Sequence, residues 1–316
     1  MVQLVTVGEL TLDHIVLPNG TVCSQVVGGG SLYAAIAARL WDLSVGIHAV
    51  TGAAFFQAIV QPIAAKGIDI TGIHAVPGNG LEMWLLHESA TTKQQVPKLS
   101  SANMTALDAV RQPLPDAYRT ATAFHLAPQS PQGHWQSLYA LKQLSPHPLI
   151  SMDIQADAIV DSAQYRDFAF CSHISAFLPS REEVDSIWHP PNLTSWISDL
   201  AAQKMGGVAV KMGDQGSLVF DPITQKIVHV PIYPTLVADT TGAGDAYCGG
   251  FLAGLTLGKD QVECAAMGTV SASFIVERYG ALEVPVPSKK ERGDRLQYVL
   301  SQINIDAPFT TKPSHN

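Results

Sequence analysis

A run of small and acidic residues in the last third of the chain could do chemistry. Residues 239–245 read DTTGAGD and lead directly into an apolar stretch over 246–257. The small residues allow a turn whose N–H groups face a ligand, and a helix that begins there adds the positive end of its dipole. These features predict a site for an anion such as phosphate. The carboxylate of Asp245 could take a proton from a hydroxyl group that attacks a phosphoryl group there.

The plain alternative is a loop whose aspartate caps a buried helix. The complete string before an apolar helix is more specific than that, and it resembles the C-terminal signature of the ribokinase-like (PfkB) carbohydrate kinases. The resemblance implies a three-layer α/β fold, with a mainly parallel central sheet, helices on both faces and a small β-lid. It also implies ATP and Mg²⁺ as cofactors and Asp245 as general base. Backbone N–H groups of Gly242, Ala243 and Gly244 would stabilise the phosphoryl group in transfer.

Two segments near the N-terminus match the part of the family that binds the acceptor. The resemblance implies that Gly28 and Gly29 contact the acceptor and that Asp13 accepts hydrogen bonds from its hydroxyl groups. The alternative for Asp13 is a solvated turn residue. The family has Asn where this chain has Tyr33, so we expect Tyr33 at the acceptor and a departure from ordinary ribose or fructose recognition. A dinucleotide fingerprint would need a glycine at this position, which disfavours a nicotinamide dehydrogenase.

Cation sites follow from the same resemblance. Glu183 matches the Glu of an Asn-x-x-Glu segment that helps to hold hydrated magnesium, and Ser180 stands at the Asn position. A carboxylate can serve Mg²⁺ through water, in its outer shell. Ser180 and Glu183 also fit a helix capping box, and both roles can hold at once. Asp239 and the carbonyl group of Thr241 match a site for a monovalent cation, K⁺, in some relatives.

The nucleotide would lie against a strand and a turn bounded by Gly213 and Gly216. Alone this pattern predicts a plain hairpin turn. The resemblance places the turn against the nucleotide, with Lys211 supplying positive charge and Thr241 nearby. It also places 268–277 near the adenine, although these residues equally suit a packing helix. Residues 254–260 are no Walker A loop, because that motif has four residues between its glycines and Ser or Thr after the Lys.

Apolar strands alternate with helical stretches along much of the chain, which is typical of a parallel sheet covered on both faces. In such sheets ligands bind beyond the carboxyl ends of the strands. The predicted strands are 1–8, 47–50, 123–126, 149–153, 174–178 and 207–211, and the predicted helices are 31–41, 57–66, 133–144, 182–188 and 195–203.

We expect one ribokinase-like domain over residues 1–305 and a flexible tail over 306–316. Two strand-like segments, at about 11–27 and 81–96, break the strand–helix rhythm and predict a small separate sheet. The resemblance makes this sheet a lid over the acceptor, and the alternative is an ordinary hairpin. The expected partners are the acceptor, ATP and, through the lid, a second copy of the chain.

Composition excludes several classes of protein. Of 316 residues, 47% are hydrophobic and 15% charged, which excludes a disordered chain. The net charge of −8 and the absence of a basic stripe disfavour nucleic acid as a partner.

Four cysteines lie far apart without a CxxC pair, which favours a reduced protein and a cytoplasmic location. Polar residues and Pro62 interrupt the uncharged run 43–65, so we expect a strand and a helix there, and no membrane partner.

The sequence therefore predicts an ATP-dependent phosphotransferase that acts on a hydroxyl group of a small polyhydroxylated substrate. Sugars, cyclitols and nucleosides remain open, and Tyr33 with the apolar strand 81–86 could stack on a ring. The second hypothesis is a binding or regulatory protein with little catalysis on a kinase scaffold. Tyr33 and Ser180 at the two Asn positions favour this hypothesis, and the intact string at 239–245 opposes it.

Overall fold

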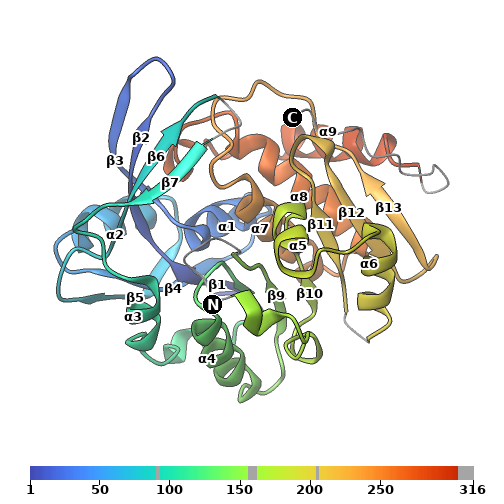
Figure 1. Ribbon diagram of the computed structural model, residues 1–316, viewed down its shortest axis with the longest axis horizontal. Helices are drawn as coiled ribbons and strands as arrows, with labels where there is room; N and C mark the ends of the chain where they lie inside the picture. The colour runs from blue at the N-terminus through green and yellow to red at the C-terminus, as the bar shows by residue number, and fades with distance from the viewer. Residues whose placement is uncertain (90–92, 156–161, 204–205, 305–316) are drawn as a thin grey trace.

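A parallel sheet forms the centre of the molecule (Figure 1). The computed structural model describes residues 1–89, 93–155, 162–203 and 206–304. Six parallel strands lie in the order β10-β9-β8-β1-β4-β5. Their bounds are β1 Leu4–Glu9, β4 Val45–Gly52, β5 Asp69–Val76, β8 Ala123–Leu126, β9 Leu149–Met152 and β10 Ala176–Phe177. An antiparallel sheet of β11 Ala209–Lys211, β12 Ser217–Asp221 and β13 Lys226–Val230 continues it, through parallel bridges from Phe177 to Val208 and from Ser180 to Lys211.

Helices cover both faces of the sheet and enclose the two large cores of the described chain. Because side chains of a strand alternate between faces, Leu4 belongs to one core while Val5 and Val7 belong to the other. The first core includes residues of α1 Gly30–Arg39, α2 Phe56–Ala65, α7 Ala243–Thr256, α8 Gln261–Ile275 and α9 Lys289–Ser301. The second includes residues of α4 Pro131–Lys142, α5 Arg181–Trp188 and α6 Leu193–Ala201, and the short α3 Met104–Ala109 contacts α4.

A separate sheet, here called the lid sheet, projects from one end of the molecule (Figure 1). It consists of β3 Val22–Gly28, β2 Thr11–Val16, β6 Leu81–His87 and β7 Lys93–Pro97, in that order. The central pair β2–β6 is parallel and the two outer pairs are antiparallel. Both segments that break the strand–helix rhythm of the sequence therefore meet in one sheet.

The predicted fold class is confirmed, and most element boundaries move by only a few residues. The predicted strand 123–126 is β8 with the same bounds, whereas 174–178 contains only the two-residue β10. The predicted tail 306–316 lies outside the described residues. Among the described helices, none combines the length and the hydropathy needed to cross a bilayer.

Candidate active site

The loop before α7 forms an open helix N-terminus, here called the cradle (242–245). Gly242 is the N-cap residue and has a positive φ of 74°, a conformation that favours glycine. Ala243 N–H donates to the carbonyl group of Thr240 (3.2 Å), which closes the turn. Within the described part of the chain, no side chain caps this helix. The predicted anion site therefore has the required backbone geometry, with the positive end of a helix dipole behind it.

Tyr33 lies beneath the cradle. A Cβ atom at position 242 would lie 2.1 Å from Cδ1 of Tyr33, so the ring packs directly against Gly242. The side chain is only 3% exposed, and its hydroxyl group has no hydrogen-bond partner among the described residues. The ring of Tyr33 therefore supports the cradle, and its hydroxyl group interacts electrostatically with Asp13, Asp239 and Asp245. The expected role of Tyr33 at the acceptor stays a prediction.

Asp13 and the first glycines come together as predicted. A Cβ atom at Gly28 would lie 2.1 Å from Oδ2 of Asp13, so only glycine leaves room for this carboxylate. Gly29 has a φ of 102° and is the N-cap residue of α1. Burial raises the pKa of Asp13 to about 7, opposed by a hydrogen bond from Thr11 and by the charge of Lys93.

Asp245 lies next to this glycine run. A Cβ atom at Gly30 would lie 2.5 Å from Oδ1 of Asp245 and 3.2 Å from Pro128, at the carboxyl end of β8. Burial raises the pKa of Asp245 to about 6, and the charge of Asp153 acts in the same direction. Lys211 and Lys93 oppose the increase. A carboxylate with a pKa near the working pH suits a general base.

Lys211 lies below the cradle in a buried ion pair. Its Nζ contacts the carboxylate of Asp153 and lies 3.6 Å from Sγ of Cys248. Although burial disfavours its charge, Asp153 raises the pKa of Lys211 well above its usual range. A Cβ atom at Gly244 would lie 3.4 Å from this Nζ, so the ammonium group lies close under the cradle.

The turn after β11 has the predicted geometry. Gly213 and Gly216 have φ values of 57° and 84°, and the short 3₁₀ helix Gly213–Gln215 links β11 to β12. Part of the range 268–277, which was expected near the adenine, is packed in the core. Ser271 accepts a hydrogen bond from Trp41 (2.9 Å), and Phe274 lies under the guanidinium group of Arg295 (3.7 Å). The packing alternative describes these two residues, whereas Glu277 lines a cavity, and the contact with adenine stays a prediction.

Ser180 and Glu183 form the predicted capping box. Ser180 N–H donates to Oε2 of Glu183 (2.6 Å), and Glu183 N–H donates to Oγ of Ser180 (3.2 Å). Burial and then the charge of Asp153 raise the pKa of Glu183 to about 8, against the influence of Lys211. The buried carboxyl groups of Glu183 and Asp153 repel each other. A divalent cation bound near them would favour their ionised forms. The described residues contain no cluster of three or more potential metal ligands.

Asp239 is held in the same loop and keeps one oxygen atom without a partner. Its Oδ1 accepts hydrogen bonds from N–H (2.8 Å) and Oγ1 (2.7 Å) of Thr241, and Nε2 of His87 lies 3.6 Å away. Oδ2 is buried and has no partner in the described structure. Such an oxygen atom suits a cation.

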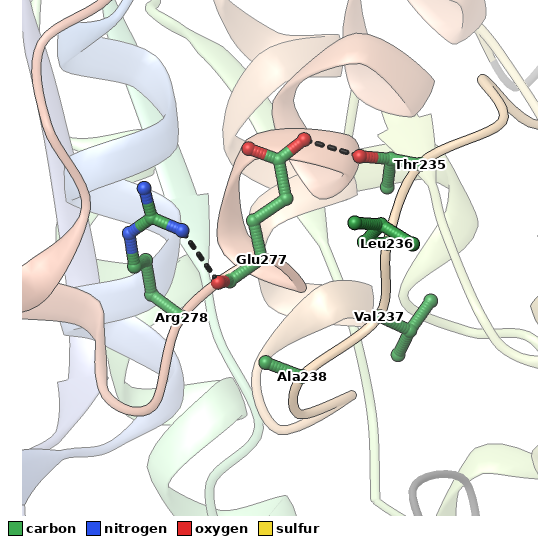
Figure 2. A pocket seen from close by; sticks show the side chains of 6 residues that line it. All are labelled: Thr235, Leu236, Val237, Ala238, Glu277 and Arg278. Atoms are coloured by element: carbon green, nitrogen blue, oxygen red, sulfur yellow. Dashed lines mark hydrogen bonds between the residues drawn. The ribbon is translucent and has the colours of Figure 1, made fainter.

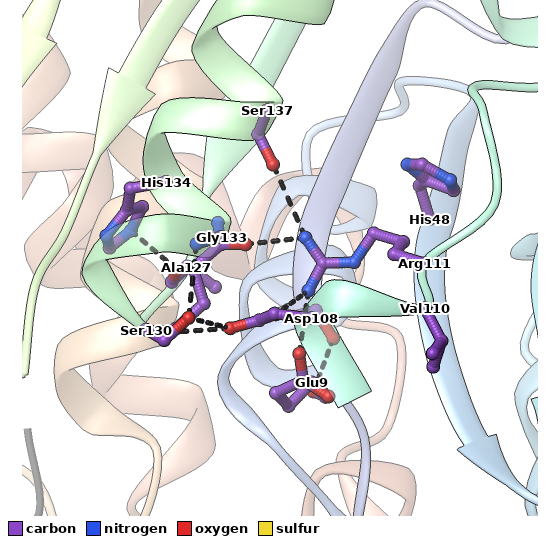
Figure 3. Close-up of polar contacts among 12 residues, drawn as sticks. Glu9, His48, Asp108, Val110, Arg111, Ala127, Ser130, Gly133, His134 and Ser137 are labelled. Atoms are coloured by element: carbon purple, nitrogen blue, oxygen red, sulfur yellow. Dashed lines mark hydrogen bonds and ion pairs between the residues drawn. The ribbon is translucent and has the colours of Figure 1, made fainter. Parts of the chain in front are cut away.

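Sequence reasoning missed a buried charged cluster at the carboxyl end of β1 (Figure 3). The guanidinium group of Arg111 pairs with Glu9 (2.6 Å) and Asp108 (2.5 Å) and donates to Gln129 (2.5 Å). A Cβ atom at Gly29 would lie 2.3 Å from the carbonyl oxygen of Glu9, so the cluster fixes the strand end on which the acceptor glycines rest. Asp108 and Arg111 are three residues apart, but Glu9 and Gln129 lie far from them in the sequence, and no local pattern joins the four.

Trp84, the aromatic residue of the strand 81–86, does not share a face of the lid sheet with Asp13. In the β2–β6 pair Asp13 is opposite Met83, and His14 is opposite Trp84. Since neighbouring strand residues point to opposite faces, Trp84 lies on the face of the lid sheet away from Asp13. There its ring lies 5.0 Å from that of His14, and Lys98 lies over it at 5.8 Å.

A cavity of about 380 Å³ lies beside the cradle loop (Figure 2). Its lining residues are Thr235, Leu236, Val237, Ala238, Glu277 and Arg278. Neither Asp13 nor Asp245 lines it, so this cavity is not where the acceptor glycines and the base meet. N–H groups of Ala238 (2.7 Å) and Asp239 (3.1 Å) donate to the carbonyl group of Val276, which ties the loop to the end of α8.

Comparison with known proteins identifies the family. The model of the pfkB family carbohydrate kinases matches residues 1–289. A cytidine kinase of Thermococcus kodakarensis is 25% identical over 289 residues, which are 90% of this chain and 100% of that protein. Two solved structures share the fold. Ribokinase of Arabidopsis thaliana with ribose and ATP has a TM-score of 0.72 at 22% identity, over 94% of this chain and 99% of that one. A candidate ribokinase II of Escherichia coli with ATP and Mg²⁺ has a TM-score of 0.78 at 19% identity, over 94% and 100%. This chain therefore belongs to the pfkB family of carbohydrate kinases.

Proposed function

We propose that this kinase transfers the γ-phosphoryl group of ATP to a hydroxyl group of a small polyhydroxylated molecule, with Asp245 as general base. The observation that carries the proposal is the close approach of Asp245 to Gly30, beside the uncapped N-terminus of α7. An acceptor on Gly28, Gly29 and Asp13 would have its hydroxyl group between the base and the cradle. Backbone N–H groups of the cradle would stabilise charge on the transferring group.

ATP and Mg²⁺ would bind on the side of the cradle that faces away from the acceptor. The turn at Gly213 and Gly216 and the ammonium group of Lys211 suit the nucleotide phosphates, and Thr241 would border them. Glu183, with Asp153 beside it, would hold hydrated Mg²⁺ from its outer shell. When bound, Mg²⁺ supplies positive charge to the phosphate oxygens. Relatives crystallised with ATP and Mg²⁺, or with ribose and ATP, support this assignment.

A panel of sugars, cyclitols and nucleosides with MgATP tests the function, read as acceptor-dependent release of ADP. We expect release well above the rate without acceptor for at least one class, and the cytidine kinase relative makes nucleosides the first class to test. The second candidate, a binding protein with little catalysis, is favoured by Tyr33 and Ser180 at the two Asn positions. Binding of an acceptor by calorimetry without ADP release would support that candidate over the kinase.

A monovalent cation such as K⁺ at Asp239 is a further part of the proposal. Oδ2 of Asp239 is buried and unpartnered within the described chain, and the carbonyl group of Thr241 is nearby. We expect K⁺ to raise turnover several-fold over tetramethylammonium, and Asp239→Asn to remove the difference. Equal rates in both salts at constant ionic strength would speak against the site.

A homodimer through the lid sheet is the proposed assembly. Val22, Leu86 and Val96 on its strands are exposed apolar residues that a partner could cover. Sedimentation velocity at micromolar concentration should give twice the chain mass, and Leu86→Lys should shift it toward the monomer. A wild-type monomer at these concentrations would contradict the assembly.

A further inference from the structure

A lysine from the lid sheet contacts the loop that precedes the cradle, and no sequence pattern indicates this contact. Nζ of Lys93, the first residue of β7, donates a hydrogen bond to Oγ1 of Thr241 (2.7 Å). The same Oγ1 donates to Oδ1 of Asp239 (2.7 Å). The lysine, the hydroxyl group and the carboxylate therefore form one directed chain of hydrogen bonds.

The lid sheet brings this charge to the site through strand pairing. Lys93 is opposite His87 in the β6–β7 pair. Nε2 of His87 lies 3.6 Å from Oδ1 of Asp239, so both strands contact the same loop. Lys93 and His87 therefore both approach the loop that precedes the cradle, and the hydrogen bond to Thr241 places the ammonium group there.

Lys93 lies close enough to three acidic residues of the proposed acceptor site to interact with them. Its charge interacts with the carboxylates of Asp13, Asp239 and Asp245, which oppose the decrease that burial causes in its own pKa. The groups that act on Asp245 are Asp153 from the end of β9, Lys211 from β11 and Lys93 from β7. Tyr33 of α1 and Cys248 of α7 also interact with it. Of the two lysines that act on Asp245, Lys211 is paired with Asp153, whereas no ion pair within 4 Å is found for Lys93 among the described residues.

We propose that Lys93 is a positioning residue for phosphoryl transfer, whose ammonium group, anchored on Thr241, keeps Asp245 ionised as base and Asp13 ionised toward the acceptor. The inference rests on the proposed function. It adds a role for the lid sheet, which would supply a positive charge for the reaction in addition to covering the acceptor. Without the charge of Lys93, a larger fraction of Asp245 would be protonated near neutral pH and could not act as base.

Carbon-13 NMR of the aspartate carboxyl groups in the full chain, without acceptor or nucleotide, tests the inference. Asp245→Asn assigns the signal of Asp245. We expect Lys93→Met to raise the apparent pKa of Asp245 by about one unit, because a nearby positive charge is lost. Lys93→Arg should restore the wild-type titration. Lys98→Met is the matched control, since Lys98 pairs with Glu82 (3.0 Å) away from the cradle. Lys93→Gln replaces Lys93→Met if the latter does not fold.

An unchanged titration of Asp245 in folded Lys93→Met or Lys93→Gln would overturn the inference, as would an equal shift in Lys98→Met. The titration needs no turnover, so it can fail while the chain remains a kinase, and it can succeed if no acceptor is phosphorylated. For an active acceptor, the acidic limb of the kcat profile should move to higher pH in Lys93→Met. The alkaline plateau should change far less, which a merely structural loss would not produce.

Discussion

Asp245→Asn is expected to lower kcat by about 10²–10⁴-fold, the range that a general base contributes. Asparagine has nearly the same shape as aspartate, so the contact with Gly30 and the cradle backbone stay in place. The amide group cannot take a proton from the acceptor hydroxyl group. Initial rates with the best acceptor of the panel measure the loss, and calorimetry with MgADP should show an affinity within a few-fold of wild type.

Asp116→Asn provides the control for Asp245→Asn. Asp116 is an exposed acid in a short 3₁₀ helix at Asp116–Tyr118, and it should keep wild-type kcat. Equal turnover in Asp245→Asn and wild type would remove Asp245 from the mechanism. A loss of nucleotide affinity in parallel with kcat would assign the effect to a damaged cradle instead of a missing base.

Lys211→Met is expected to reduce the free energy of unfolding by about 3–5 kcal/mol. The carboxylate of Asp153 is 2% exposed, and removal of Lys211 leaves it buried without its partner. Methionine keeps most of the apolar stem of lysine, so the loss reports mainly on the unpaired charge. Urea denaturation followed by circular dichroism measures the change.

The double variant Lys211→Met, Asp153→Asn separates charge from packing. If the unpaired carboxylate causes the loss, the double variant should be more stable than Lys211→Met alone. It should still have lower turnover than wild type, because the positive charge under Gly244 is missing. A loss below about 1 kcal/mol in Lys211→Met would mean that water or a rearranged side chain replaces the ion pair.

Local patterns in the sequence predicted much of the fold. The strand 123–126 and the helix after Gly242 follow from apolar runs bounded by turn residues, and the capping box of Ser180 and Glu183 follows from their spacing. The central sheet could not be ordered by periodicity alone. Nor could β10 be predicted correctly, since only two residues of its apolar run pair as a strand.

The site was less predictable because its contacts join distant segments. Asp153 and Lys93 could not be predicted as site residues, because their contacts depend on the packing of β9 and the lid sheet next to the loop before α7. Tyr33 was expected at the acceptor because it stands where the family has Asn, and the sequence did not show that its ring packs under Gly242. The sequence also could not show which residues of the strand 81–86 face the site, since strand register decides which face of the lid sheet each one occupies.

The most direct test is the fate of the γ-phosphoryl group of radiolabelled ATP, with wild-type enzyme and the active acceptor class in hand. Label should appear covalently on the acceptor in proportion to the ADP formed, and both should fall together in Asp245→Asn. Label found only in inorganic phosphate, or on an acceptor at the same rate in Asp245→Asn, would contradict transfer by the cradle and its neighbouring carboxylate.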